Sequence, residues 1–182
     1  MAETKKIMSV KDIEEKLSEI ATEIANRNMG EKKIALIGIV RRGVNLANRL
    51  EKLIEKMTDA ELLVGSIDIT FYGKNHQVIE KFPQLNGTDV PFSIDNIPVV
   101  LVDDILYTGK TIHRAIDALL DLGEPSEIQL AAFLDRGRRS FPISADYVGA
   151  RVPSTGLERV ALHLEETDGI DEVVIEKKGS EK

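Results

Sequence analysis

The sequence predicts an α/β fold in which helices cover both faces of a mostly parallel central sheet. Short apolar runs typical of strands alternate along the chain with longer segments whose apolar residues recur at helical spacing. The 182 residues are enough for one compact domain with a sizeable core. Ligands of such sheets bind beyond the carboxyl ends of the strands. The turns that follow strands are therefore the first candidates for a functional site.

The first part of the chain contains two predicted helices and two predicted strands. Residues 10–27 are expected to form an amphipathic helix, with Ser9 as its N-cap and Asp12 three residues later. Residues 33–39 and 62–72 are apolar runs that predict strands. A second helix is expected between these strands, and its apolar face comprises Leu46, Leu50, Leu53, Ile54 and Met57.

The next segment, residues 73–91, shows no sustained period and contains two prolines and two glycines. Irregular stretches of this length are uncommon inside compact domains and often cover functional sites. We therefore expect a lid here.

The second half of the chain predicts four strands and one helix. A buried strand is expected at residues 98–103, a helix from about Thr108 to Leu122, and Gly123 is a natural stop signal for that helix. The buried side of the helix would consist of Ile112, Ile116, Leu119 and Leu120. The three further strand signals lie at residues 127–135, 159–164 and 171–176.

Composition excludes several classes of protein. The chain has no cysteine, so disulfides and thiolate metal sites are ruled out, and its formal net charge of −7 disfavours generic nucleic-acid binding. No apolar run approaches the length of a membrane span, and the N-terminus lacks the apolar core of a signal peptide. We expect a cytoplasmic protein without membrane contact.

Two adjacent carboxylates, Asp103 and Asp104, follow the buried strand "VVLV". Such a pair is costly unless it is solvated, paired or engaged with a cation. Neighbouring residues of an extended strand point to opposite sides, so the two groups are not expected to grip one ion together. If the strand bends at this pair, they suit one diol, or a diol and a metal-bound water.

The turn after this pair is suited to phosphate. It comprises Leu106, Tyr107, Thr108, Gly109, Lys110 and Thr111. Backbone N–H groups at a helix N-terminus favour a bound anion, the threonines add hydroxyl donors, and glycine lets the backbone approach closely. Diol and phosphate contacts only a few residues apart match the hydroxyls and the 5′-phosphate of a ribose phosphate.

This stretch, "VVLVDDILYTGKT", closely resembles the binding motif for 5-phosphoribosyl 1-pyrophosphate (PRPP) in type I phosphoribosyltransferases. The segments "GIVRRGVNLANRL", "SIDITFY", "LDRGRRSFPISADYVG" and "RVPSTGLERV" extend the likeness from about residue 13 to residue 175. These segments occur in the same order as in the bifunctional pyrimidine operon attenuation regulators, which have uracil phosphoribosyltransferase activity, and the chain resembles that subfamily. The family has a small hood beside the sheet, expected here from about residue 135 to 157 together with N-terminal elements.

The resemblance implies transfer of phosphoribosyl from PRPP to uracil, which gives UMP and pyrophosphate, with Mg²⁺ as cofactor. Asp103 and Asp104 would orient the ribose and hold the metal, directly or through water. Residues 107–111 would anchor the 5′-phosphate, and Leu106 would be a further PRPP-binding residue. Arg41, Arg42 and Gly43 would hold pyrophosphate at a turn that often contains a non-proline cis peptide. A homodimer or tetramer is expected.

Catalytic roles would fall to Asp103, Asp104, Arg42 and Lys74. Lys74 would replace a lid arginine that is usual in the family at the neighbouring position, now Gly73.

The base would lie against Asp135, Arg136 and Gly137, where the family reads the pyrimidine mostly with backbone groups. The sequence leaves open whether the following residues, Arg138 and Arg139, are exposed to solvent.

A messenger-RNA leader is the further partner that the resemblance implies. Family regulators commonly present arginines on the first helix, where this chain has Glu14, Glu15 and Glu19 and retains Arg27. Each charge reversal repels phosphate instead of releasing a counterion. Two alternatives therefore remain beside uracil transfer: a purine phosphoribosyltransferase, and a non-catalytic regulator that senses nucleotides and binds RNA.

Overall fold

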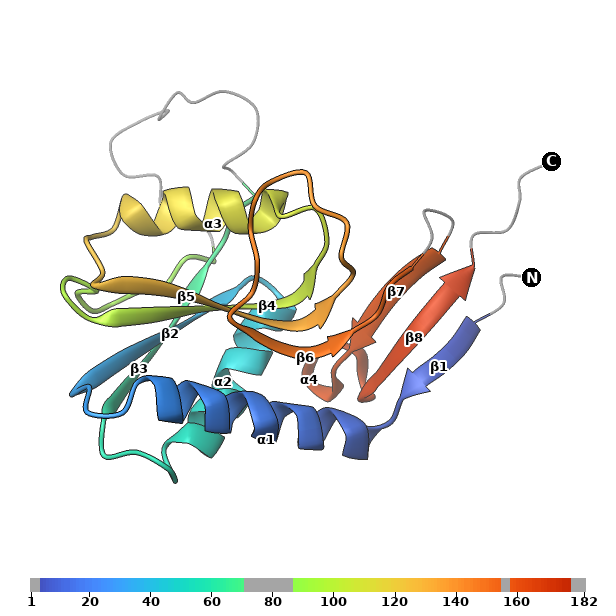
Figure 1. The fold of residues 1–182 in the computed structure, drawn as a ribbon, viewed down its shortest axis with the longest axis horizontal. Coiled ribbons are helices and arrows are strands. Elements are labelled where there is room, and N and C mark those ends of the chain that lie inside the picture. The colour runs from blue at the N-terminus through green and yellow to red at the C-terminus, as the bar shows by residue number, and fades with distance from the viewer. Residues whose placement is uncertain (1–3, 71–86, 155–157, 178–182) are drawn as a thin grey trace.

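A parallel sheet of five strands forms the centre of the molecule (Figure 1). The computed structural model describes residues 4–70, 87–154 and 158–177. The strand order is β3-β2-β4-β5-β6. Their bounds are Glu61–Ile67 for β3, Lys33–Ile39 for β2, Pro98–Leu106 for β4, Glu127–Asp135 for β5 and Tyr147–Arg151 for β6. The predicted α/β class and the mostly parallel sheet are confirmed.

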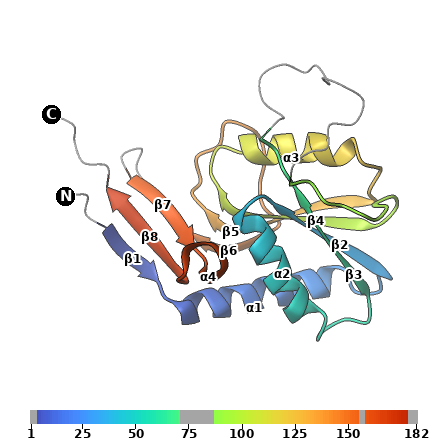
Figure 2. The ribbon, with the colours of Figure 1, turned by 180° about the vertical axis from the view of Figure 1, so that it is seen from behind.

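Helices cover both faces of this sheet (Figures 1 and 2). Helices α1 (Val10–Arg27) and α2 (Arg42–Ile54) pack on one face, and α3 (Lys110–Leu120) packs on the other. Because side chains alternate along a strand, Val100 joins the core beneath α1 and α2, whereas Leu101 joins the core beneath α3. The sheet is therefore apolar on both faces.

A second, antiparallel sheet stands beside the carboxyl ends of the central strands (Figure 1). Its order is β1-β8-β7, with β1 at Thr4–Met8, β8 at Glu172–Lys177 and β7 at Glu158–His163. The short helix α4 (Glu165–Asp168) connects β7 to β8. We refer to this sheet with α4 as the hood. The segment expected to form most of the hood, about residues 135–157, instead contributes β6 to the central sheet.

Most predicted elements are present, and several have different bounds. The helix at residues 10–27 and the strands at 33–39 and 127–135 are found as predicted. The strand predicted over 62–72 ends at Ile67, because the Asp68 side chain accepts a hydrogen bond from the Thr70 N–H and turns the chain. The strand predicted to end at Asp103 continues to Leu106, because β4 and β5 remain paired that far.

Helix α3 is shorter than predicted, and the residues on its buried side differ from the predicted ones. Leu120 is 52% exposed, and Ala115 and Ala118 are buried in its place. Gly123 does not have the left-handed backbone of a helix stop. A Cβ atom there would lie 2.6 Å from an Asp95 carboxylate oxygen, so a larger residue would displace the Asp95 side chain. Met57 was predicted on the apolar face of the second helix, but it lies beyond α2 and is 46% exposed.

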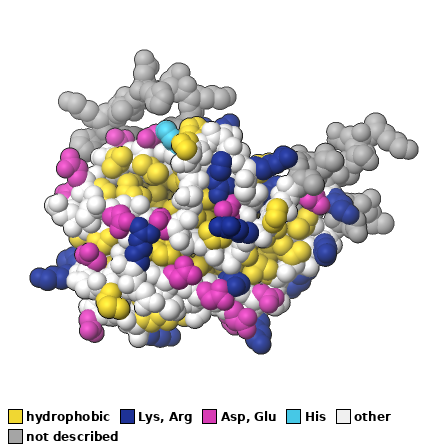
Figure 3. All heavy atoms as spheres, viewed as in Figure 1, with side chains coloured by type: hydrophobic (Ala, Val, Ile, Leu, Met, Phe, Trp, Pro, Cys, Tyr) yellow, Lys and Arg dark blue, Asp and Glu magenta, His cyan; other side chains and the backbone are white. Residues whose placement is uncertain are grey.

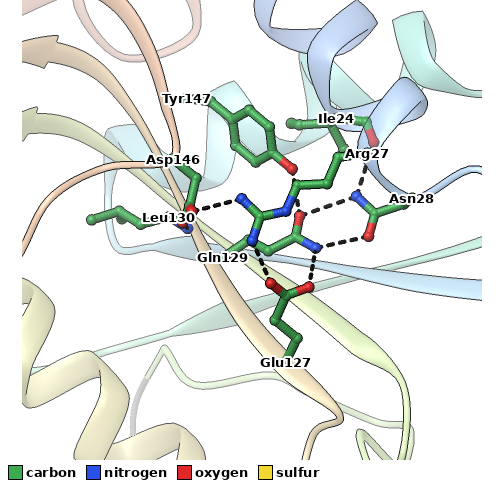
Figure 4. A network of polar contacts seen from close by, with 8 residues as sticks. All are labelled: Ile24, Arg27, Asn28, Glu127, Gln129, Leu130, Asp146 and Tyr147. Carbon is green, nitrogen blue, oxygen red and sulfur yellow. Dashed lines mark hydrogen bonds and ion pairs between the residues drawn. The ribbon is translucent and has the colours of Figure 1, made fainter.

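The C-terminal end of α1 is fixed to the central sheet by polar side chains (Figure 4). Arg27 pairs with Glu127 and with Asp146. The buried Asn28 exchanges hydrogen bonds with Gln129 at 2.8 and 3.0 Å. The positive charge of Arg27 is therefore engaged within the protein.

Arg49 of α2 joins the hood to the sheet domain. Its guanidinium donates to both oxygens of Asp171 at 2.6 and 2.8 Å and to both oxygens of Glu166 at 2.7 and 2.8 Å. The Arg49 guanidinium lowers the pKa of both carboxyl groups below their usual values. This ion-pair cluster ties α4 and the start of β8 to α2.

Because of this ion-pair cluster, the free energy of unfolding should vary with pH in the acid range. Because these carboxyl groups have lower pKa values in the folded protein, the unfolded chain binds more protons at acid pH. The free energy of unfolding is expected to fall as pH is lowered from about 5 to about 3. An Arg49→Met variant should be less stable by about 2–4 kcal/mol at pH 7 and should show a flatter acid dependence. Urea unfolding across this pH range measures both, and equal acid slopes in the two proteins would contradict the role of Arg49.

Candidate active site

The carboxylate pair lies near the carboxyl end of β4, where the central sheet faces the hood (Figure 1). Asp103 is only 5% exposed, and one of its oxygens accepts the Asp104 backbone N–H at 3.0 Å. Burial, and then the neighbouring Asp104 carboxylate, raise the pKa of Asp103. An Asp104 oxygen accepts the Ile105 N–H at 2.9 Å. The protein therefore holds a buried acidic group whose negative charge is poorly compensated.

The predicted phosphate turn closes around a cavity of about 140 Å³. Gly109 is the N-cap of α3 with φ of +85° and has no side chain to cap the helix, and the Thr108 hydroxyl accepts the Lys110 N–H at 3.4 Å. Uncapped N–H groups at a helix N-terminus attract anions. The cavity is lined by Asp103, Ile105, Leu106, Tyr107, Thr108, Gly109, Thr111 and Ile112. The structure thus places Asp103 and most of the predicted phosphate-binding residues around one space.

The turn predicted to hold pyrophosphate follows β2, next to β4 in the sheet. It contains a non-proline cis peptide between Val40 and Arg41, as the resemblance led us to expect. Gly43 lies against β4, because a Cβ atom there would be 2.4 Å from the Val102 carbonyl oxygen and 3.5 Å from the Asp103 Cα. The turn is therefore packed directly against the strand that carries the acidic pair.

Two arginines of this turn have different surroundings. The exposed Arg41 precedes α2, and Arg42 is the first residue of the helix. Arg42 forms a bidentate ion pair with Asp168 of α4, at 3.0 Å from Nε and 2.7 Å from Nη2. The Asp168 carboxylate raises the pKa of Arg42, and Asp104 adds a smaller effect of the same sign. The sequence did not indicate that a hood carboxylate would occupy this guanidinium.

The predicted base-binding residues begin at the end of β5. An Asp135 oxygen accepts the Gly137 N–H at 2.8 Å, and the Arg136 N–H donates to the Leu106 carbonyl at 2.9 Å. The Arg136 guanidinium lies 4.1 Å from the centre of the Tyr107 ring and donates to Ser154. The side chains of Asp135 and Arg136 and the backbone N–H groups of Arg136 and Gly137 are therefore all engaged within the protein.

Arg139 is a site residue that the sequence did not identify. It donates to the Tyr107 carbonyl at 2.8 Å, to the Ile143 carbonyl at 2.8 Å and to Asp135 at 2.7 Å. The Ser140 N–H donates to the Thr108 carbonyl at 2.9 Å in the same region. Arg139 thus clamps the loop after β5 to the phosphate turn. Its position four residues after Asp135 was the one available sequence signal.

The acidic pair fits a magnesium ion that arrives with a phosphorylated ligand. Mg²⁺ prefers oxygen ligands and is usually bound by one or two carboxylates, waters and ligand phosphates. Within residues 4–70, 87–154 and 158–177, no group of three or more His, Asp or Glu side chains forms a ready metal cage. Asp103 and Asp104 would supply the oxygen donors, and a cation would compensate the charge of the buried Asp103.

Two expectations concern other parts of the chain. Lys74 and most of the predicted lid lie outside the described residues. Residues 87–91 are described, and Asp89 forms an isolated antiparallel bridge with Ser66 of β3. No helix in the described parts of the chain is long and apolar enough to cross a membrane.

Solved structures with this fold include purine phosphoribosyltransferases. The chain aligns with a hypoxanthine-guanine phosphoribosyltransferase from Bacillus anthracis at a TM-score of 0.71 and 22% identity, covering 96% of this chain and 99% of the other. A hypoxanthine phosphoribosyltransferase from Trypanosoma cruzi gives a TM-score of 0.74 at 20% identity, with 95% and 96% covered. At these identities the likeness shows the fold alone.

Sequence comparison is more specific. Residues 4–160 match the family model described as "Phosphoribosyl transferase domain". The "Bifunctional protein PyrR" of Halalkalibacterium halodurans is 47% identical over 176 residues, which cover 96% of this chain and 98% of the relative. The protein of the same name from Caldicellulosiruptor bescii is 44% identical, with 97% of each chain covered. The chain therefore belongs to the phosphoribosyl transferase family and, within it, to the bifunctional PyrR proteins.

Proposed function

We propose that this protein transfers the phosphoribosyl group of PRPP to N1 of uracil and releases UMP and pyrophosphate. One observation carries the proposal: a single cavity brings the buried Asp103 together with the N-terminus of α3. The first matches ribose hydroxyls and the second matches a 5′-phosphate. Membership in the family supports the same reaction.

Each part of the site has a role in this reaction. Backbone N–H groups of the turn at residues 107–111 bind the 5′-phosphate, and this binding positions C1′ of the ribose. Asp103 and Asp104 accept hydrogen bonds from the ribose hydroxyls and would hold Mg²⁺, directly or through water. The metal, when bound, stabilises charge on the leaving pyrophosphate. The turn at residues 40–43 supplies donors fixed in advance for the same charge, and in the proposal Lys74 assists from the lid.

Uracil is proposed as the base because the relatives that cover nearly the whole chain are PyrR proteins. The purine enzymes share the fold at 20–24% identity, which does not transfer their specificity. With the Arg136 and Asp135 side chains and the Arg136 and Gly137 N–H groups engaged elsewhere, the base would be read by the remaining backbone groups of this loop. We propose a single phosphoribosyltransferase domain over residues 1–182 that acts in the cytoplasm as a homodimer or tetramer.

Base specificity is tested by supplying one base at a time. Purified protein is incubated with PRPP and Mg²⁺, together with uracil, hypoxanthine, guanine or xanthine, and nucleotide products are separated by chromatography. UMP from uracil alone is the expected result. A purine nucleotide as the main product would overturn the assignment of the base, and the absence of product with every base would favour a non-catalytic sensor.

The second function that the relatives' name implies is proposed to be regulation through a messenger-RNA leader. In this chain the exposed side of α1 is acidic (Figure 3), with Asp12, Glu14, Glu15, Glu19 and Glu23 exposed. Lys16 pairs with Glu19 at 2.6 Å, and the charge of Arg27 is engaged by Glu127 and Asp146. The α1 face therefore repels phosphate, so any RNA contact would use other basic residues.

RNA affinity is expected to respond to this acidic face. A Glu15→Lys, Glu19→Lys double variant should bind a pyrimidine-operon leader RNA more tightly than the wild type, by about tenfold at 0.1 M salt. The slope of affinity against salt should also become steeper. Fluorescence anisotropy with labelled RNA at several salt concentrations measures both quantities. An unchanged affinity would show that α1 does not approach the RNA.

A further inference from the structure

One face of α2 is paired with the hood along its length. Arg42, Asn45 and Arg49 are spaced three and then four residues apart, so they lie on one stripe of the helix. Asn45 Nδ2 donates to the Thr167 hydroxyl at 2.7 Å, and Arg49 pairs with Glu166 and Asp171. Arg42, at the end of the stripe that adjoins the pyrophosphate turn, pairs with Asp168. The hood thereby contacts the turn at residues 40–43 through this ion pair, and it also contacts Arg136, whose Nη2 donates to the Glu158 carbonyl of β7 at 2.9 Å.

Asp168 is itself held in place. Its Oδ2 accepts the Leu164 N–H at 2.9 Å, and the side chain is 21% exposed. The Arg42 side chain is 31% exposed and uses Nε and Nη2 for the carboxylate. Within the described part of the chain, Nη1 of Arg42 makes no hydrogen bond. Among the described residues, the guanidinium is therefore held by Asp168 on one side and has Nη1 without a partner on the other.

We propose that Asp168 is a positioning residue for PRPP, which acts by orienting Arg42 so that Nη1 faces the pyrophosphate. The inference rests on the proposed function, because pyrophosphate is the group that the turn would hold. An arginine already fixed by a bidentate pair loses less conformational freedom when it binds a phosphate oxygen. The competing arrangement, in which Asp168 must be displaced by pyrophosphate, predicts the opposite change in affinity.

Asp168→Asn tests the inference, with Glu166→Gln as the matched control. Both substitutions neutralise one acidic residue of α4 that pairs with an arginine of α2, but Glu166 lies against Arg49, away from the turn. Asp168→Asn is expected to raise the KM for PRPP and the Kd of pyrophosphate by about tenfold. The KM for uracil should stay within about twofold. Glu166→Gln should lower the melting temperature and leave the KM for PRPP unchanged.

A double variant that carries both Asp168→Asn and Arg42→Lys distinguishes a positioning role of Asp168 from a general loosening of the hood. If Asp168 acts through Arg42, the double variant should bind pyrophosphate as weakly as Arg42→Lys alone. Unchanged or tighter binding by Asp168→Asn would overturn the inference, as would equal losses in Asp168→Asn and Glu166→Gln. Calorimetric titration with PRPP distinguishes failure of the proposed function from failure of the positioning role. No binding by the wild type would overturn the proposed function, whereas wild-type binding that Asp168→Asn leaves intact would overturn the positioning role alone.

Discussion

Asp103→Asn is expected to lower kcat/KM by at least about a hundredfold, because the amide has no negative charge to offer the ribose hydroxyls or Mg²⁺. The ligand-free variant should nevertheless melt at the same temperature as the wild type or higher. Burial raises the pKa of Asp103 in the folded protein, so ionisation of this group near neutral pH opposes folding. A neutral amide avoids that cost.

Two measurements at pH 8 test this prediction. One is the enzymatic activity, and the other is the melting temperature in the presence of a chelator. Asp117→Asn is the control, because Asp117 is a half-exposed carboxylate on α3 whose partner is His113. The control should retain full activity. If Asp103→Asn kept kcat/KM within about threefold of the wild type, the buried carboxylate would not be part of the reaction site.

Gly43→Ala is expected to impair both activity and stability. The added methyl group would lie 2.4 Å from the Val102 carbonyl oxygen, a backbone atom that cannot rotate away. Either the turn at residues 40–43 or the end of β4 must move, and both border the acidic pair. We expect kcat/KM to fall by about ten- to a hundredfold and the free energy of unfolding by about 2–3 kcal/mol.

Gly30→Ala provides the same chemical change without the contact. Nothing lies within 4 Å of the added atom there, and the positive φ of +91° accounts for a cost of about 1 kcal/mol. Its activity should equal that of the wild type. Steady-state kinetics and urea unfolding of both variants give the comparison. Full activity in Gly43→Ala would show that the close packing of this turn is not required.

The strongly periodic elements could be predicted from the sequence because their signals are local. Helix α1 was predicted with its N-cap, and β2 and β5 with their bounds, since apolar spacing and capping depend on neighbouring residues. The elements not predicted are short: β1, β6 and α4. In β1 two lysines mask the apolar pattern. In β6 the apolar pattern is broken by Gly149, where an added Cβ atom would lie 2.6 Å from the Phe133 carbonyl oxygen.

In the candidate site, too, the features encoded by neighbouring residues could be predicted, whereas the contacts between distant residues could not. The acidic pair and the phosphate turn are contiguous, so one stretch of sequence was enough to predict that they lie together. The pairing of Arg42 with Asp168 joins residues 126 positions apart, and the Arg139 contact with Tyr107 spans 32 positions. Such contacts depend on how the hood and the loops pack, which no local pattern encodes. The structure supplied them.

The central claim is that this chain moves a phosphoribosyl group from PRPP to uracil rather than to water. A ³¹P NMR time course with wild-type protein, PRPP, Mg²⁺ and uracil tests it most directly, because substrate and both products have separate signals. The account predicts that UMP and pyrophosphate appear in equal amounts as PRPP disappears, and that omission of uracil stops the reaction. Release of pyrophosphate with ribose 5-phosphate in place of UMP, or no change in PRPP, would contradict it.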